Sequence, residues 1–104
     1  GFTLNKVQGV PLTYSVSQNY PNPFNGMTTI SFAIPDYSHV TLSITDIRGN
    51  TVATLINQPM LPGNHTINWY GKNDAGSHQA SGVYLIYLNT GSKVKYSKRL
   101  LFLK

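Results

Sequence analysis

Apolar and polar residues alternate along most of the chain, which predicts a protein built from short β-strands. In residues 28–34 the side chains of Ile30, Phe32 and Ile34 fall on one face of an extended segment, and residues 40–46 repeat this pattern. Further strands are expected at residues 66–69, 82–88 and 93–103, and the turn residues 47–50 before the apolar positions Val52, Leu55 and Ile56 predict a hairpin or tight corner. Because no window of eleven residues carries a helical stripe, the sequence predicts an all-β protein.

Glycine and proline punctuate these strands at regular intervals. Pro21 and Pro23 fix their own φ angles and keep the residues before them extended, so residues 18–26 are expected to form a rigid extended turn. Short strands separated by such turns over about a hundred residues are typical of an immunoglobulin-like antiparallel β-sandwich of about seven strands. A small closed barrel is the alternative. Trp69 is the expected anchor of the core between two sheets about 10 Å apart.

The length of 104 residues predicts one domain. Residues 18–104 are expected to form the sandwich, and residues 1–17 a linker or lead-in strand. The chain starts at Gly1 without an initiator Met or a signal-peptide pattern, so it is expected to be a fragment of a longer protein. No apolar run approaches the roughly 20 residues that a membrane-spanning helix needs, and we expect no membrane insertion.

Charge is scarce and uneven in this chain. Only 11% of residues are charged, and eight Lys or Arg oppose three Asp and no Glu, for a net charge of +5. Paired acids and bases, which many hydrolases need, are therefore hard to assemble, and we do not expect an enzyme. The basic residues gather near the end of the sequence, where the candidates for recognition of a partner are Lys95, Lys98, Arg99 and Lys104.

Other sites are weakly indicated. The three histidines, His39, His65 and His78, lie too far apart in the sequence for a local zinc motif. The segment 73–77 offers one carboxylate, from Asp74, which is little for calcium and is equally typical of an Asx turn. We expect no metal or other cofactor. The basic segment lacks the motifs of RNA-binding and cold-shock domains, so we expect no nucleic-acid partner.

Several tyrosines suggest a different alternative, a platform on which sugars stack. The candidates are Tyr14, Tyr20, Tyr37, Tyr70 and Tyr87. Their spacing does not place three of them in a line, and tyrosines in sheets often only cover neighbouring strands.

Linked motifs in residues 18–104 resemble the type A C-terminal sorting domain of the type IX secretion system. They include Gln18-Asn19-Tyr20-Pro21-Asn22-Pro23-Phe24-Asn25, the segment 46–55 with Asp46 and Gly49, the segment 73–76 ending in Gly76, Gly82-Val83-Tyr84 and the ending Lys98-Arg99-Leu100-Leu101-Phe102-Leu103-Lys104. The residues that carry the family motif are Pro21, Asn22, Pro23, Asp46, Gly49, Gly76, Gly82 and Tyr84.

The sequence departs from the usual pattern at two places. Tyr70 stands where the family often has Asp, and Gly26-Met27 replaces a common Pro or Thr. A related immunoglobulin-like domain occurs in the flagellar hook-capping protein, which shares the Asp-x-x-Gly hairpin and the Gly-Val-Tyr strand. The position of Lys104 as the last residue favours the sorting domain.

The resemblance implies a non-catalytic secretion signal in a Gram-negative bacterium. The partners implied are the outer-membrane translocon of the type IX system, a sortase-type protease and an N-terminal cargo domain in the parent protein, which would pass through the periplasm to the cell surface or the medium. Two other classes stay open from the residues alone: a carbohydrate-binding module of a secreted enzyme, and a structural accessory module.

Overall fold

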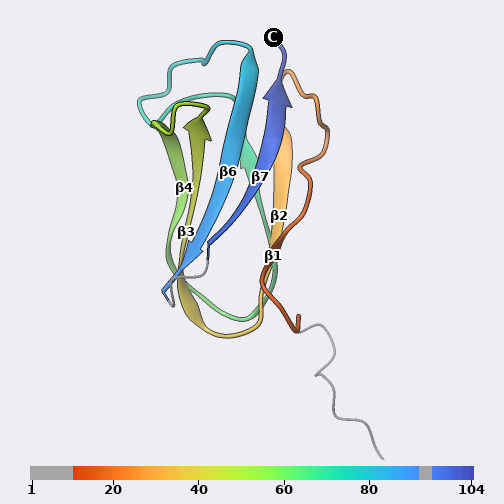
Figure 1. The fold of residues 1–104 in the computed structure, drawn as a ribbon, viewed down its shortest axis with the longest axis vertical. Coiled ribbons are helices and arrows are strands. Elements are labelled where there is room, and N and C mark those ends of the chain that lie inside the picture. The colour runs from red at the N-terminus through yellow and green to blue at the C-terminus, as the bar shows by residue number, and fades with distance from the viewer. Residues whose placement is uncertain (1–10, 92–94) are drawn as a thin grey trace, which may run out of the picture.

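The computed structural model describes residues 11–91 and 95–104, which form two antiparallel sheets packed face to face (Figure 1). The three-stranded sheet has the order β1-β2-β5 and the four-stranded sheet the order β4-β3-β6-β7. The strands are β1 (Ser15–Val16), β2 (Thr28–Ile34), β3 (Ser38–Asp46), β4 (Thr51–Met60), β5 (Gly63–Trp69), β6 (Gly82–Thr90) and β7 (Lys95–Phe102). The predicted all-β sandwich of about seven strands is confirmed.

β2 and β3 form where the period-two pattern predicts them, β4 follows the expected hairpin turn, and β1 lies in the expected linker or lead-in strand. In β2 the inward side chains of Ile30 and Ile34 are fully buried, and in β6 those of Ile86 and Leu88 are too. The side chains between them point away from the core and are partly exposed in β6. The described residues contain no helix that is long and apolar enough to cross a membrane.

Four aromatic rings pack together at one end of the core. Trp69 is only 2% exposed and its ring centroid lies 5.4 Å from that of Tyr84 and 5.6 Å from that of Phe24. Phe24 in turn stacks on Phe102 with centroids 4.8 Å apart. The Trp69 indole N–H donates to the backbone oxygen of Lys72 at 2.9 Å, so its one polar atom is satisfied. Trp69 is therefore the core anchor that the sequence predicts.

Residues 15–24 change from one sheet to the other. Ser15 and Val16 pair with β2, and Tyr20 exchanges two backbone hydrogen bonds with Thr29 of the same strand. After Pro21 and Pro23, both preceded by cis peptide bonds, Phe24 pairs in parallel with Phe102 of β7. The expected rigid turn at residues 18–26 is thus a segment that closes one side of the sandwich. Pairing with β2 begins before Gln18, and residues 1–10 of the lead-in lie outside the described part of the chain.

A glycine-dependent contact supports the same end of the core. Gly71 has a φ of 71°, and a Cβ placed there would lie 2.7 Å from the ring of Phe102. A side chain at this position would have to adopt left-handed backbone geometry and push the ring aside. Glycine at residue 71 therefore allows the loop after β5 to lie directly against β7.

Replacement of Trp69 by alanine should destabilise the protein by about 3–5 kcal/mol, because it removes the largest ring of the aromatic cluster and leaves a cavity. The neighbouring Tyr70 is 54% exposed, so Tyr70→Ala is the matched control and should change the stability by less than about 0.5 kcal/mol. Urea unfolding of both variants measures the difference. Equal losses in the two would contradict the role of Trp69.

Candidate functional site

The exposed part of β7 is the surface on which the candidate recognition residues lie. Leu100 and Phe102 are buried, so the strand's alternation places their side chains and that of Lys98 on the core side. Lys95 and Arg99 lie on the opposite, solvent-facing side and are exposed. Lys98 is half-buried at the side of the sandwich.

The fourth candidate, Lys104, follows the end of β7. Its backbone N–H donates to the Ser81 hydroxyl at 2.9 Å, and its residue is exposed. Nine residue steps separate it from Lys95, which corresponds to about 30 Å in an extended strand. The structure therefore brings Lys95 and Arg99 onto one face and separates Lys98 and Lys104 from them.

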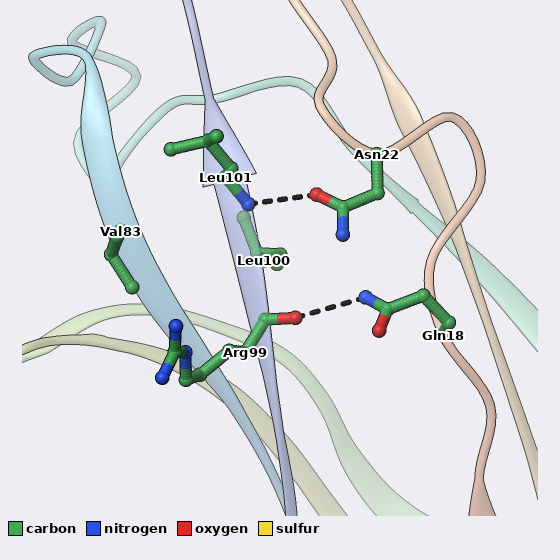
Figure 2. Close-up of a pocket in the computed structure, with 6 residues that line it drawn as sticks. All are labelled: Gln18, Asn22, Val83, Arg99, Leu100 and Leu101. Carbon is green, nitrogen blue, oxygen red and sulfur yellow. Dashed lines mark hydrogen bonds between the residues drawn. The ribbon is translucent and has the colours of Figure 1, made fainter.

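The outer edge of β7 is covered by side chains from residues 18–24 (Figure 2). The Gln18 amide donates to the backbone oxygen of Arg99 at 2.9 Å, and the Leu101 backbone N–H donates to Asn22 Oδ1 at 2.9 Å. Phe24 continues the contact with two backbone hydrogen bonds, from its N–H to Leu101 O and from Leu103 N–H to its own oxygen. These bonds take the place of a neighbouring strand on this edge.

A buried polar cluster holds this covering segment in place. Asn19 is 2% exposed, and its amide donates to the Thr28 hydroxyl at 2.9 Å and to Pro21 O at 3.1 Å. The Thr28 hydroxyl, also buried, donates to the same Pro21 oxygen at 2.7 Å. The Asn19 and Thr28 side chains are buried, so loss of either one would leave a polar atom of the other without this partner.

A shallow hollow of about 320 Å³ opens beside this edge, lined by Gln18, Asn22, Val83, Arg99, Leu100 and Leu101. Figure 2 shows the Arg99 guanidinium next to Val83, on the side of β7 away from Gln18. The lining combines amides, one cation and aliphatic carbon, without a nucleophile or a carboxylate. Such a surface can bind peptide or an anionic group but holds no acid and base for proton transfer.

The residues of the family motif serve the fold. Pro21, Asn22 and Pro23 belong to the segment that covers β7, and Gly82 begins β6. Gly76, with a φ of 88°, lies in the loop that Asn73 closes by accepting hydrogen bonds from Ala75 N–H and Ser77 N–H. The Asx turn expected at this loop is therefore present.

Asp46 organises the turn between β3 and β4. Its Oδ1 atom accepts hydrogen bonds from the backbone N–H groups of Arg48 and Asn50, both at 2.9 Å, and Gly49 occupies the left-handed position with a φ of 92°. The bond from the Asn50 backbone is the main cause that lowers the pKa of the Asp46 carboxyl below its ordinary 3.8. The Asn50 side chain and Arg48 act in the same direction.

Tyr84 ties the start of β6 to the chain before it. Its hydroxyl donates to Ala80 O at 2.6 Å, as a tyrosine near the start of the corresponding strand does in many immunoglobulin-like domains. Burial raises the pKa of the Tyr84 hydroxyl, and the negative charge of Asp46 adds to the increase.

The weaker candidates from the sequence are dispersed. Within residues 11–91 and 95–104, no three His, Cys, Asp or Glu side chains are grouped so that they could hold a metal ion. His39 bonds to Asn57 Oδ1 and His65 to Leu61 O. The Asp74 Oδ1 atom accepts the Thr54 backbone N–H, which covers part of the edge of β4.

Of the five candidate tyrosines, only Tyr14 and Tyr37 line the same hollow, together with Asp36, to which Tyr14 donates at 2.6 Å. Tyr20 and Tyr70 are exposed elsewhere, and Tyr87 is half-buried on β6. The tyrosines therefore do not form one platform.

Sequence reasoning missed the residues that cover β7. The sequence predicts a turn at Gln18, Asn22 and Phe24, whereas these residues contact a strand about 80 residues later in the chain. The prolines that signal the turn give no sign of this long-range pairing. The contact between Gly71 and Phe102 also had no signal in the sequence.

The turn at Asp46 predicts a pH dependence of stability. Because the pKa is lower in the folded state than its ordinary value, the ionised carboxylate stabilises the fold above about pH 4, and this contribution is lost as the pH falls through the folded-state pKa. Asp46→Asn keeps an oxygen acceptor but cannot ionise, so it should lose less stability than the wild type between pH 7 and pH 2.5. Urea unfolding at both pH values measures the two losses, and identical losses would contradict this account.

Comparisons with known proteins agree with the fold. No curated protein matches the sequence. Among solved structures, FlgD from P. aeruginosa superposes with a TM-score of 0.60 at 18% identity, over 88% of this chain and 77% of that one. PorZ, an essential bacterial surface component of the type-IX secretion system of Porphyromonas gingivalis, superposes with a TM-score of 0.54 at 21% identity over 88% of this chain. The chain spans only 11% of the length of PorZ.

The match of a family model is more specific than these superpositions. The model of the FlgD Ig-like domain matches residues 17–93, which include the segment that covers β7 and all strands from β2 to β6. The match extends over more than half of the chain, and the two-sheet topology agrees with it. The protein therefore belongs to the FlgD Ig-like domain family.

Proposed function

We propose that this domain is a non-catalytic secretion signal, a type A sorting domain that directs its parent protein through the type IX outer-membrane translocon. The observation that carries the proposal is that the motifs resembling such sorting domains contain residues with structural roles and, near their end, exposed cations. The motif residues from Pro21 to Tyr84 stabilise turns and cover the edge of β7. The last strand, β7, places Lys95 and Arg99 on its solvent-facing side.

Two further observations support this assignment. PorZ, a part of which shares the fold of this chain, is a component of the type-IX secretion system. The hollow beside β7 also suits recognition better than catalysis, because amide groups, Arg99 and aliphatic side chains line it. The sorting role accounts for both the family motifs and the exposed cations.

The proposal implies particular partners and a route. The translocon would recognise the folded domain in the periplasm of a Gram-negative bacterium, a sortase-type protease would act on the parent, and an N-terminal cargo would reach the cell surface or the medium. The outward cations Lys95 and Arg99 are the part of the candidate set most accessible to a macromolecular partner. Lys98 and Lys104 are secondary, since one is half-buried and the other lies at the far end of the strand.

Fusion of residues 12–104 behind a signal peptide and a fluorescent protein tests the sorting role. In a host with the type IX machinery the fluorescence should reach the cell surface or the medium, and in the same host without the translocon it should stay in the periplasm. Fractionation of the cells measures this. Retention of a folded fusion in the periplasm of the competent host would refute the proposal.

Charge reversal tests the recognition surface separately from the fold. Lys95→Glu with Arg99→Glu should block export with little change in the melting temperature, because exposed charges contribute little to stability. The matched control is Arg48→Glu with Lys72→Glu, which makes the same change of charge at exposed positions on two loops. Normal export of the first variant would overturn the role of β7, as would an equal block in the control.

A further inference from the structure

The four sheet edges of the sandwich are not equally protected. Residues 18–24 cover the edge of β7, and Lys95 and Arg99 add charge there. β1 has only two residues and contacts β7 across the side of the sandwich. The edge of β4 is partly covered, because Asp74 forms hydrogen bonds with the backbone of Val52 and Thr54. β4 also contains Pro59, which has no backbone N–H, and its pairing with β3 is distorted by register shifts. These are devices that prevent strands from pairing with other molecules.

β5 lacks all of these devices. It is a seven-residue edge strand without proline or a charged residue, and no charged residue occurs anywhere between Arg48 and Lys72. Within the described ranges 11–91 and 95–104, no segment other than β2 pairs with it. Its free edge is therefore open to another strand.

The register of β5 against β2 fixes which backbone groups point outward. Thr29 and Ser31 bond to Tyr20 and Ser17 on the other side of β2. Their neighbours in β2 therefore bond to β5, at Gly63, His65, Ile67 and Trp69. The alternation leaves the backbone N–H and C=O groups of Asn64, Thr66 and Asn68 directed to the open edge.

We propose that β5 is a docking edge for a second copy of this chain, in an antiparallel dimer centred on Thr66. Pairing of Thr66 with its own copy places Asn64 opposite Asn68 of the second chain, and all three outward residues form about six backbone hydrogen bonds. The exposed side chains then stay on one face of the joined sheet, as Asn–Asn and Thr–Thr pairs. The two three-stranded sheets become one sheet that crosses a two-fold axis.

The order of the outward residues favours a second copy over other occupants, because Asn64, Thr66 and Asn68 form the same sequence in both directions and therefore pair like with like about a two-fold axis. The chain carries a net charge of +5, so most of its surface repels another copy, and the cations of β7 lie on the opposite side of the sandwich from β5. The uncharged edge of β5 is a part of the described surface where two copies can meet with little repulsion, and unlike the equally uncharged β4 it is not covered by Asp74. A single edge contact is smaller than a standard stable interface, so the dimer is expected to be weak. This inference does not depend on the sorting role.

Cysteine cross-linking tests the register, because the chain has no native cysteine. In Thr66→Cys the two introduced residues face each other across the axis with Cα atoms about 5.5 Å apart, within the range of a disulfide. Asn68→Cys is the control, since two copies of it lie about 13 Å apart in the proposed register. Under mild oxidation Thr66→Cys should form covalent dimer about tenfold faster than Asn68→Cys, and equal rates would overturn the register.

Sedimentation velocity tests the association itself. The weight-average sedimentation coefficient of the 104-residue chain should rise between about 10 μM and 1 mM, and Thr66→Lys should abolish the rise with an unchanged melting temperature. Thr66→Pro removes the backbone N–H that points to the open edge and leaves the hydrogen bonds between β5 and β2 in place. A folded Thr66→Pro protein should therefore also stay monomeric. A wild-type protein that is monomeric at 1 mM, or association that persists in Thr66→Lys, would overturn the proposal.

Discussion

Four aromatic rings from distant parts of the chain meet at one end of the core, and the two sheets depend on this contact for their alignment. Trp69 ends β5, Tyr84 lies near the start of β6, Phe102 ends β7 and Phe24 comes from the segment that precedes β2. The glycine at residue 71 lets the following loop approach Phe102 closely. Because the rings come from both sheets, the cluster sets how the termini of four segments lie relative to one another.

The strands and the core were predictable because they follow from local alternation. The inward positions Ile30, Phe32 and Ile34 of β2 could be identified from the alternation, and Trp69 from its size and place in a short apolar segment. The same alternation places Lys98 on the side of Leu100, although its charge first suggested an exposed role. Local pattern is thus sufficient for the fold class and for the face of a side chain.

The covering of β7 could not be predicted in this way. Proline marks residues 18–26 as extended, but the partner of this segment lies at the other end of the chain, and a sequence pattern carries no information on such a distance. The amides of Gln18 and Asn22 acquire their role only when β7 is beside them. The cations of the candidate site and the face of each can therefore be predicted from the sequence, whereas the segment that lies beside β7 is known only from the structure.

The pairing of Phe24 with β7 also determines how the domain bears force. The two segments run in the same direction, so tension applied between the chain before Gln18 and the chain after Phe102 pulls them past each other along their length. The bonds of Phe24, Asn22 and Gln18 to β7 are then loaded together, in shear, and cannot open one after another as in a hairpin pulled from its ends. A domain linked in this way resists mechanical extension at the point where its two ends meet.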